Sequence, residues 1–161
     1  MSAPLIPHDE LIAKAWLLAA VPGLAGKVAT TLPDPPWADD EFVQIMSVGG
    51  PPDPEIPRLD PVVTLSCFAM TPGSAKPPWG VANQLAMRIW RATFPIRYAP
   101  HPAVELDING AAGVTGQYGR AQCTSVQAAS PIRRLPSDPS QYAVYNLDLI
   151  FSWTPVSEVF A

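Results

Sequence analysis

Apolar residues recur along the chain with two different periods, which predict helices in two places and strands in several others. Helical spacing runs through residues 8–20 and again through residues 78–93, so each range is predicted to be an amphipathic helix. Asp9 and Glu10 suit the first turn of the earlier helix, where an acid complements the helix dipole. The later helix begins after a Pro-Pro pair and ends before Pro95.

Period-two alternation of apolar and polar residues predicts the strands. The clearest strand is Tyr142–Thr154, whose alternate residues from Ala143 to Trp153 are apolar, and we expect it inside the sheet. Val62–Met70 is partly apolar on both faces, which indicates a central strand covered by a helix. The other predicted strands are Lys27–Leu32, Phe42–Val48, Val104–Asn109 and Gln117–Ala129, and a flexible turn is predicted for Gly110–Gly119.

Prolines, 21 among 161 residues, divide the chain into these elements. Because proline cannot donate to a sheet ladder or sit inside a helix, each cluster marks a loop, as at Pro131–Pro139. The order helix, strands, helix, strands predicts an α+β fold: a mostly antiparallel sheet with two helices packed on one face. The length fits a single domain over residues 1–161, with residues 155–161 as a loose C-terminal tail.

Charge and cysteine usage exclude several classes of protein. A formal net charge of −4 lacks the basic footprint of a phosphate-binding protein, which argues against direct nucleic-acid binding. Cys67 and Cys123 have no metal-ligand spacing, so we expect both to be buried in a reducing compartment. No stretch reaches the roughly 20 apolar residues that span a bilayer, and the N-terminus has no signal-peptide pattern. We therefore expect a cytoplasmic protein with no membrane partner.

Motifs that carry chemistry are missing from the sequence. It contains no nucleophile elbow, P-loop, dinucleotide fingerprint or zinc-protease motif. His8 lies at a helix start and His101 lies between two prolines, where a surface residue is expected rather than a general base. The glycines of 110–119 lie between two predicted strands, so no helix dipole faces an anion there. We expect no catalytic residue, no cofactor and no metal, and hence no enzyme.

Two tryptophans and one arginine pair are candidates for contact with a partner. Trp37 and Trp79 each follow a Pro-Pro pair at the edge of a loop, where both an aromatic anchor and a core role are open. Arg133 and Arg134 form the only dense basic pair, a pattern that is more often a solvated loop. The charged fraction of only 15% indicates surfaces for partners, and self-assembly is one possibility.

Two stretches carry a resemblance to a known family. Residues 42–50 read F-V-Q-I-M-S-V-G-G, and residues 58–69 read R-L-D-P-V-V-T-L-S-C-F-A. With an N-terminal helix, an Ala/Trp-rich second helix and a long closing strand, the chain resembles the tail terminator proteins of long-tailed bacteriophages, also called tail completion or minor tail proteins. The resemblance runs from about Leu11 to Thr154. The chain departs from the family pattern at Pro61 and at Lys76-Pro77-Pro78-Trp79.

The resemblance implies a structural virion protein rather than an enzyme. Such a subunit assembles with itself as a ring, commonly a hexamer, on the last ring of the major tail tube protein. It stops polymerisation of the tube and offers the surface that joins a head–tail connector or head-closure protein. DNA would pass through the lumen without specific binding. The protein would be assembled in the bacterial host cytoplasm and reside in the tail or neck of the virion.

The resemblance also assigns expectations to individual residues. Gly49 and Gly50 would serve a strand end that needs an unusual backbone angle. Arg58 and Asp60 would be interface or loop-fixing residues, with a local salt bridge or turn as an equal alternative. The Arg133-Arg134 pair could meet an acidic rim of the tail tube.

Two other functions stay open at this point. One is a different neck or head-closure connector of the same virion, which would differ in the partner that it binds. The other is a small-ligand binding module or enzyme with its site between sheet and helices. The sequence supplies no set of convergent polar groups for such a pocket.

Overall fold

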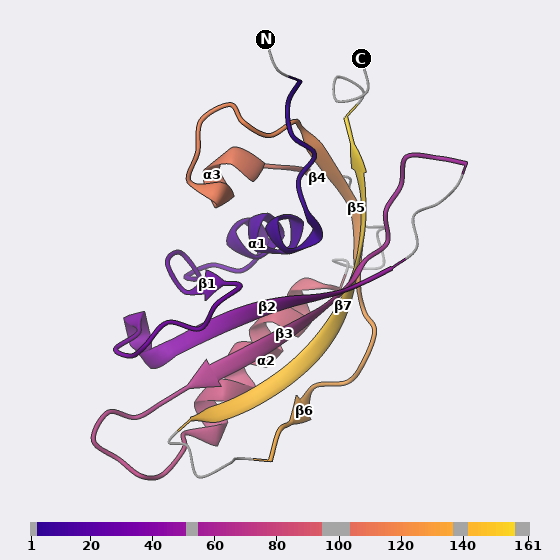
Figure 1. Cartoon of the computed structure of the whole chain (residues 1–161). Helices are drawn as coiled ribbons and strands as arrows, with labels where there is room; N and C mark the ends of the chain where they lie inside the picture. The colour runs from indigo at the N-terminus through magenta and orange to yellow at the C-terminus, as the bar shows by residue number, and fades with distance from the viewer. Residues whose placement is uncertain (1–2, 51–54, 95–103, 137–141, 157–161) are drawn as a thin grey trace.

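The computed structural model describes residues 3–50, 55–94, 104–136 and 142–156 (Figure 1). The chain order of the elements is α1 (Asp9–Ala20), β1 (Val28–Ala29), the 3-10 helix η1 (Ala38–Asp40), β2 (Glu41–Gly49), β3 (Val62–Ala69), α2 (Trp79–Ala92), β4 (Val104–Leu106), α3 (Ile108–Ala112), β5 (Ala121–Ala128), β6 (Arg133–Arg134) and β7 (Ala143–Pro155). Both predicted amphipathic helices are therefore present, at nearly the predicted bounds.

In the described part of the chain, seven strands form one curled sheet in the order β1-β2-β3-β7-β5-β4, with β6 also paired to β7. Every pairing is antiparallel except that of β1 with β2. The two strands expected to be internal, β3 and β7, lie next to each other in the middle of the sheet. The predicted α+β class with a mostly antiparallel sheet is confirmed.

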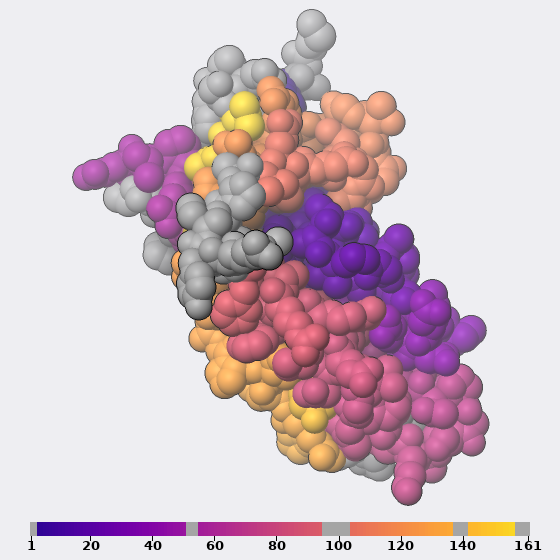
Figure 2. Space-filling model, turned by 180° about the vertical axis from the view of Figure 1, so that it is seen from behind, coloured from indigo at the N-terminus to yellow at the C-terminus, as the bar shows by residue number. Residues whose placement is uncertain are grey.

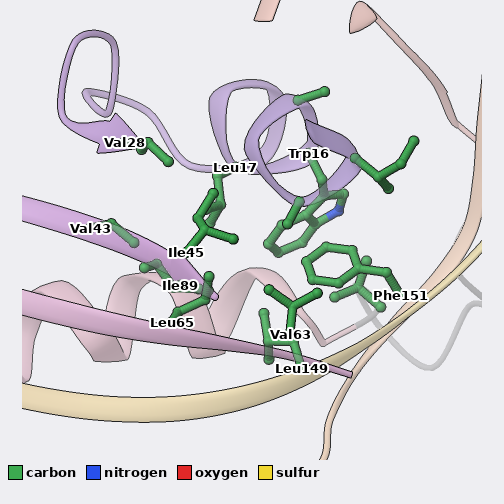
Figure 3. Close-up of a cluster of buried hydrophobic side chains, with 14 of the residues drawn as sticks. Trp16, Leu17, Val28, Val43, Ile45, Val63, Leu65, Ile89, Leu149 and Phe151 are labelled. Atoms are coloured by element: carbon green, nitrogen blue, oxygen red, sulfur yellow. The ribbon is translucent and has the colours of Figure 1, made fainter. Parts of the chain in front are cut away.

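One face of the sheet carries both long helices. On β3, Val63, Leu65 and Cys67 are fully buried on this face, as their alternation predicts. Trp16 and Leu17 of α1 point onto the same cluster, and the Trp16 ring meets Phe151 edge-on at 5.5 Å (Figure 3). The other helix, α2, adds its buried stripe Ala82, Leu85, Ala86 and Ile89. Apolar burial on one face thus holds the two helices to the sheet.

Residues 104–113 differ from the prediction. Of the expected strand Val104–Asn109, only residues 104–106 form a strand, β4. The chain then turns into the short helix α3, which Asp107 caps: its Oδ1 accepts the Gly110 N–H at 3.0 Å. The helix ends at Gly113, which has a φ of +70°. Val104, predicted to face inward, is 43% exposed. The predicted flexible turn therefore begins inside a helix, and the side chain of Asn109 fixes the later part of that turn by bonding the backbone of residues 117 and 118.

Smaller differences concern loops and termini. β1 has two residues rather than six, and β6 forms inside the proline loop that begins at Pro131. Pro155 belongs to β7, and Val156 donates its N–H to the Arg120 carbonyl, so these two residues are held to the sheet and are not part of a loose tail. Residues 157–161 and His101 lie outside the described residues. His8 caps α1, since its Nδ1 accepts the Leu11 N–H.

A buried ion network joins α2 to the edge of the sheet. Glu41 at the start of β2 is 8% exposed, and its Oε1 accepts from Lys27 Nζ at 3.0 Å and from Arg88 Nη2 at 2.7 Å. Lys27 is 5% exposed and also bonds Asp39. Burial alone would lower the pKa of Lys27, but the bonds to Asp39 and Glu41 outweigh it, so the pKa is raised.

Candidate functional site

No described helix or strand covers the face of β2, β3 and β7 opposite the helices, although the loop that carries Trp37 closes one end, and we call it the open face (Figure 1). Residues paired across an antiparallel sheet point to the same side, so the register defines rows across this face. From one end to the other, these rows are Phe42–Phe68–Val144, Gln44–Ser66–Asn146, Met46–Thr64–Asp148 and Val62–Ile150.

An aromatic cluster closes one end of the open face. The Trp37 ring lies 6.1 Å from Phe42, 6.2 Å from Phe68 and 5.2 Å from Tyr142, centroid to centroid. Its Nε1 donates to the Pro33 carbonyl at 2.9 Å, and the residue is 7% exposed. Trp37 was a candidate for an exposed anchor at a loop edge. The structure instead buries it, because it covers the nearby Phe42 together with Phe68 and Tyr142, which are distant in sequence.

A polar group occupies the middle of the open face. Thr64 Oγ1 donates to Asp148 Oδ1 at 2.7 Å, and Arg133 Nη1 donates to Asp148 Oδ2 at 3.0 Å. Partial burial works to raise the pKa of Asp148, but the bonds from Arg133, Thr64 and Ser130 outweigh it and leave the pKa lowered. Arg133 is therefore engaged in an ion pair within its own chain. Asn146 in the next row has a buried Oδ1 without a hydrogen-bond partner in the described structure.

Exposed aliphatic side chains form the other end of the open face. Met46 is 59% exposed and Val48, in the bulge before Gly49, is 67% exposed, although both belong to β2. Gly49 ends this strand at a bulge with a φ of +84°, which confirms the unusual backbone angle predicted there. Gly50 does not have the predicted positive φ. Its constraint is steric, because a Cβ at this position would lie 3.0 Å from the Asp60 carbonyl oxygen. The two glycines thus shape the edge of an apolar surface.

Arg58 and Asp60 fix the chain where it returns to the sheet. Arg58 Nε and Nη2 donate to Asp60 Oδ1 at 3.1 and 3.0 Å, and Ser152 Oγ donates to the same oxygen. The Ser152 bond is the main cause of the lowered pKa of Asp60, and Arg58 adds to it against the effect of burial. The structure shows the local salt bridge that was the alternative for this pair. The segment 55–58 projects from the sheet, and Ile56 in it is 50% exposed (Figure 1).

The two arginines of β6 lie on opposite faces of the sheet. Arg133 pairs with Asn146 and faces the open side, whereas Arg134 pairs with Tyr145 and faces the helix side. The Arg134 guanidinium carbon lies 3.8 Å from the centroid of the Trp79 ring, a cation–π contact. Trp79 is half-buried and meets Tyr145 at 6.1 Å. The adjacent pair is therefore not one basic patch.

Six of the eight candidate residues thus border or line the open face, and two meet each other at the start of α2. The six are Trp37, Gly49, Gly50, Arg58, Asp60 and Arg133, and the two are Trp79 and Arg134. The strand residues of the open face were not among the candidates from the sequence, including those that give it its character: Met46, Val48, Thr64 and Asp148. The alternation of residues 42–48 places Met46 on the other face of the strand from the buried Ile45. This signal could have identified the exposed apolar end of the open face.

The open face suits contact with another protein surface. Its charges are bonded within the chain, and its exposed part is aliphatic. Among the residues that the structure describes, no three His, Cys, Asp or Glu side chains group as metal ligands, and no helix is long and apolar enough to cross a bilayer. Burial raises the pKa of Cys67 far above its usual range and that of Cys123 to about 11, which makes both thiols poor nucleophiles.

Comparisons with known proteins do not identify a family for this chain. No protein-family model matches the chain, and no curated protein sequence matches it. The geometry of the open face and the short sequence resemblance are therefore the basis for a functional interpretation.

Proposed function

We propose that this chain is a structural virion protein that caps the tail tube of a long-tailed bacteriophage as a ring, commonly a hexamer. In this role it stops tube polymerisation and joins the tail to the head. The observation that carries the proposal is the open face. A sheet covered on one side only, with Met46 and Val48 exposed on the other, is typical of a subunit that is completed by its neighbours.

A ring needs two different surfaces on each subunit, because a head-to-tail contact closes only when one patch meets another. The open face is one such patch. The projecting segment 55–58 is a second, since Ile56 is exposed on it and the Arg58–Asp60–Ser152 bonds fix its base. Surfaces that are fixed before binding lose little conformational entropy on assembly. These features support a self-assembling subunit.

The other partners follow from the same proposal. One side of the ring would meet the major tail tube protein, and the other would meet a head–tail connector or head-closure protein. Arg134, exposed and held on Trp79, is the residue suited to an acidic rim on one of them. The net charge of −4 favours a lumen through which DNA slides without specific binding. Assembly would occur in the bacterial host cytoplasm, and the product would reside in the virion neck.

Light scattering over a concentration series, with negative-stain microscopy of the same samples, tests the proposal. We expect a ring with a central hole and a mass near six copies of the 17.2 kDa chain. Val48→Glu should abolish the ring, because a carboxylate without a partner costs several kcal/mol to bury. Val81→Glu is the matched control, since Val81 is 43% exposed on α2, away from the open face.

Two outcomes would contradict the proposal. One is a wild-type chain that stays monomeric alone and also when mixed with tail tubes. The other is an equal loss of assembly in Val48→Glu and Val81→Glu, which would show that the open face has no special part in it. A ring that binds a head-closure ring but no tube would instead identify another neck connector.

A further inference from the structure

The segment between β1 and β2 reaches over one end of the open face. We call residues 31–40 of this segment the strap. The structure describes all ten of these residues, and only Trp37 among them is buried. The Trp37 ring lies 5.2 to 6.2 Å from those of Phe42, Phe68 and Tyr142, centroid to centroid. The strap therefore covers aromatic side chains that belong to the end of the open face.

Few contacts hold the strap in this position. Besides the Trp37 ring, two hydrogen bonds join it to distant parts of the described chain. Asp39 accepts one from Lys27 Nζ, and the Asp40 carbonyl accepts the other from the Met70 N–H at 3.0 Å. The bond of the Trp37 indole stays inside the strap. Segments with so few buried contacts open at a lower free-energy cost than the core does.

The strap also carries backbone strain where it joins β2. Asp39 has a φ of +53° and Asp40 a φ of +55°. In the part of the chain that the structure describes, every other residue with a positive φ is a glycine. The left-handed region is unfavourable for residues with a side chain, and aspartate tolerates it better than most. The closed strap therefore has a conformational cost that opening relieves.

Internal bonds and prolines give the strap a shape of its own. Pro33, Pro35 and Pro36 fix three of its φ angles. The Pro33 carbonyl accepts from the Trp37 indole at 2.9 Å, and the Trp37 carbonyl accepts the Asp40 N–H at 3.1 Å. Movement at its two ends would therefore carry the strap as a unit, with Trp37 on it.

Opening of the strap would extend the open face. The row Phe42–Phe68–Val144 lies directly beside the polar middle of the same face, and Phe42 is only 4% exposed beneath the strap. Aromatic side chains are enriched at the centres of protein interfaces. The other side of the sheet offers no such surface at its middle, because α1 and α2 cover it (Figure 2).

We propose that the strap is closed over the aromatic end of the open face in the free subunit and opens when a second copy of the chain binds that face. This inference rests on the proposed function, because the second copy is the next subunit of the ring. A form that binds only when open has an apparent affinity reduced by the fraction of open molecules. The closed strap thus limits association of free subunits.

Hydrogen exchange measured by NMR tests the opening in the subunit itself. The Met70 amide reports on the strap, because its bond to the Asp40 carbonyl breaks when the strap opens. The Leu65 amide, in the middle of β3 between two paired strands, reports on the core. Both are measured in the Val48→Glu background, in which we expect no ring. The Met70 amide should have a protection factor at least about tenfold below that of Leu65.

Three variants change the strap in different ways. Asp39→Ala removes the bond to Lys27 and tolerates the positive φ less well, so Met70 exchange should become at least about threefold faster. Asp40→Gly keeps the carbonyl and relieves strain, so exchange should slow by at least about threefold. Asp34→Ala is the matched control, because it removes an exposed acid of the strap that bonds no described residue.

Assembly of the same variants without Val48→Glu tests the link to the ring. The midpoint concentration for assembly, from light scattering, should fall for Asp39→Ala and rise for Asp40→Gly by about the same factors as the exchange rates change. Asp34→Ala should leave both readouts unchanged. A merely structural role for the strap predicts the opposite order, with the looser variant assembling less well.

Several results would overturn the strap. Equal protection of Met70 and Leu65 would show that the strap opens only when the whole chain unfolds. Equal effects of Asp39→Ala and Asp34→Ala would show that the bond to Lys27 does not hold it. A ring whose midpoint ignores the change in exchange would refute the coupling and keep the proposed function. The absence of a ring from every chain that lacks Val48→Glu would refute the proposed function, and the coupling with it, even where exchange responds as expected.

Discussion

Replacing Glu41 with alanine tests the ion network that joins α2 to the sheet edge. Glu41 is buried and receives hydrogen bonds from both Lys27 and Arg88. The substitution leaves the ammonium of Lys27, itself only 5% exposed, with Asp39 as its remaining acidic partner. The lost hydrogen bond costs Arg88 less, because 44% of its side chain is exposed and water can solvate its guanidinium. The cost therefore comes mainly from Lys27.

The expected loss is about 3 kcal/mol of the free energy of unfolding, at the lower end of the range for a broken buried ion pair, since Asp39 remains. For a chain of this length, the same loss lowers Tm by roughly 6–12 °C. The double variant Lys27→Met/Glu41→Ala should recover at least about 1 kcal/mol, because it leaves no buried ammonium. Glu105→Ala is the matched control. Its pair with Arg120 is half-exposed on both sides and screened by water, so its loss should destabilise the chain far less than that of Glu41.

Urea unfolding at pH 7, followed by tryptophan fluorescence, measures all four proteins. Runs at two protein concentrations separate any effect of assembly from the stability of the subunit. Midpoints should shift without a change in slope. A stabilising role for the network is excluded if Glu41→Ala and Glu105→Ala cost the same, or if the double variant is less stable than Glu41→Ala.

Two further predictions concern the ends of the open face. Gly49→Ala should lower the free energy of unfolding by about 1 kcal/mol, because this residue has a φ of +84°. Gly80→Ala should raise it by up to about 1 kcal/mol, because the helix position has open space around it. Urea unfolding measures both, and a change of the same sign in the two variants would contradict this reasoning. The pKa of Asp60 is lowered in the folded chain, so its contribution to stability is present above its ordinary value of 3.8 and is lost as pH falls through the folded pKa. Ser152→Ala removes the hydrogen bond that is the main cause of the lowered pKa of Asp60. The free energy of unfolding should then depend less on pH below about pH 4 than in the wild type. Equal pH dependence in the two proteins would refute this role of the Ser152 bond.

The elements with long, regular patterns were predictable from the sequence. Alternation in β3 and β7 and the stripe of α2 each extend over eight residues or more, so local exceptions did not hide the period. The helix α3 was missed, since Leu106 and Ile108 continue the alternation of β4. The N-cap at Asp107 and Gly113 five residues after Ile108 were the available signals, and they are short-range features that periodicity does not detect.

The candidate site was only partly predictable, because its residues come together through strand register. The burial of Trp37 depends on Phe68 and Tyr142, which are far away in the sequence. The separation of Arg133 from Arg134 required knowing that β6 is a strand, since a loop would have left the pair on one surface. The positive φ of Gly49 was predicted correctly, because glycine at the end of a strand is itself a local signal for that conformation.

The place of β7 in the sheet has a consequence for synthesis of the protein on the ribosome. β7 follows every other element in chain order, yet it is the strand that connects β3 to β5. While residues 143–155 are still in the exit tunnel, the hairpin of β2 and β3 with α2 and the pair β4–β5 have no ladder between them. Their apolar faces stay open for that interval, and chaperones would be the means of shielding them. A circular permutant that begins with β7 should shorten this exposed stage.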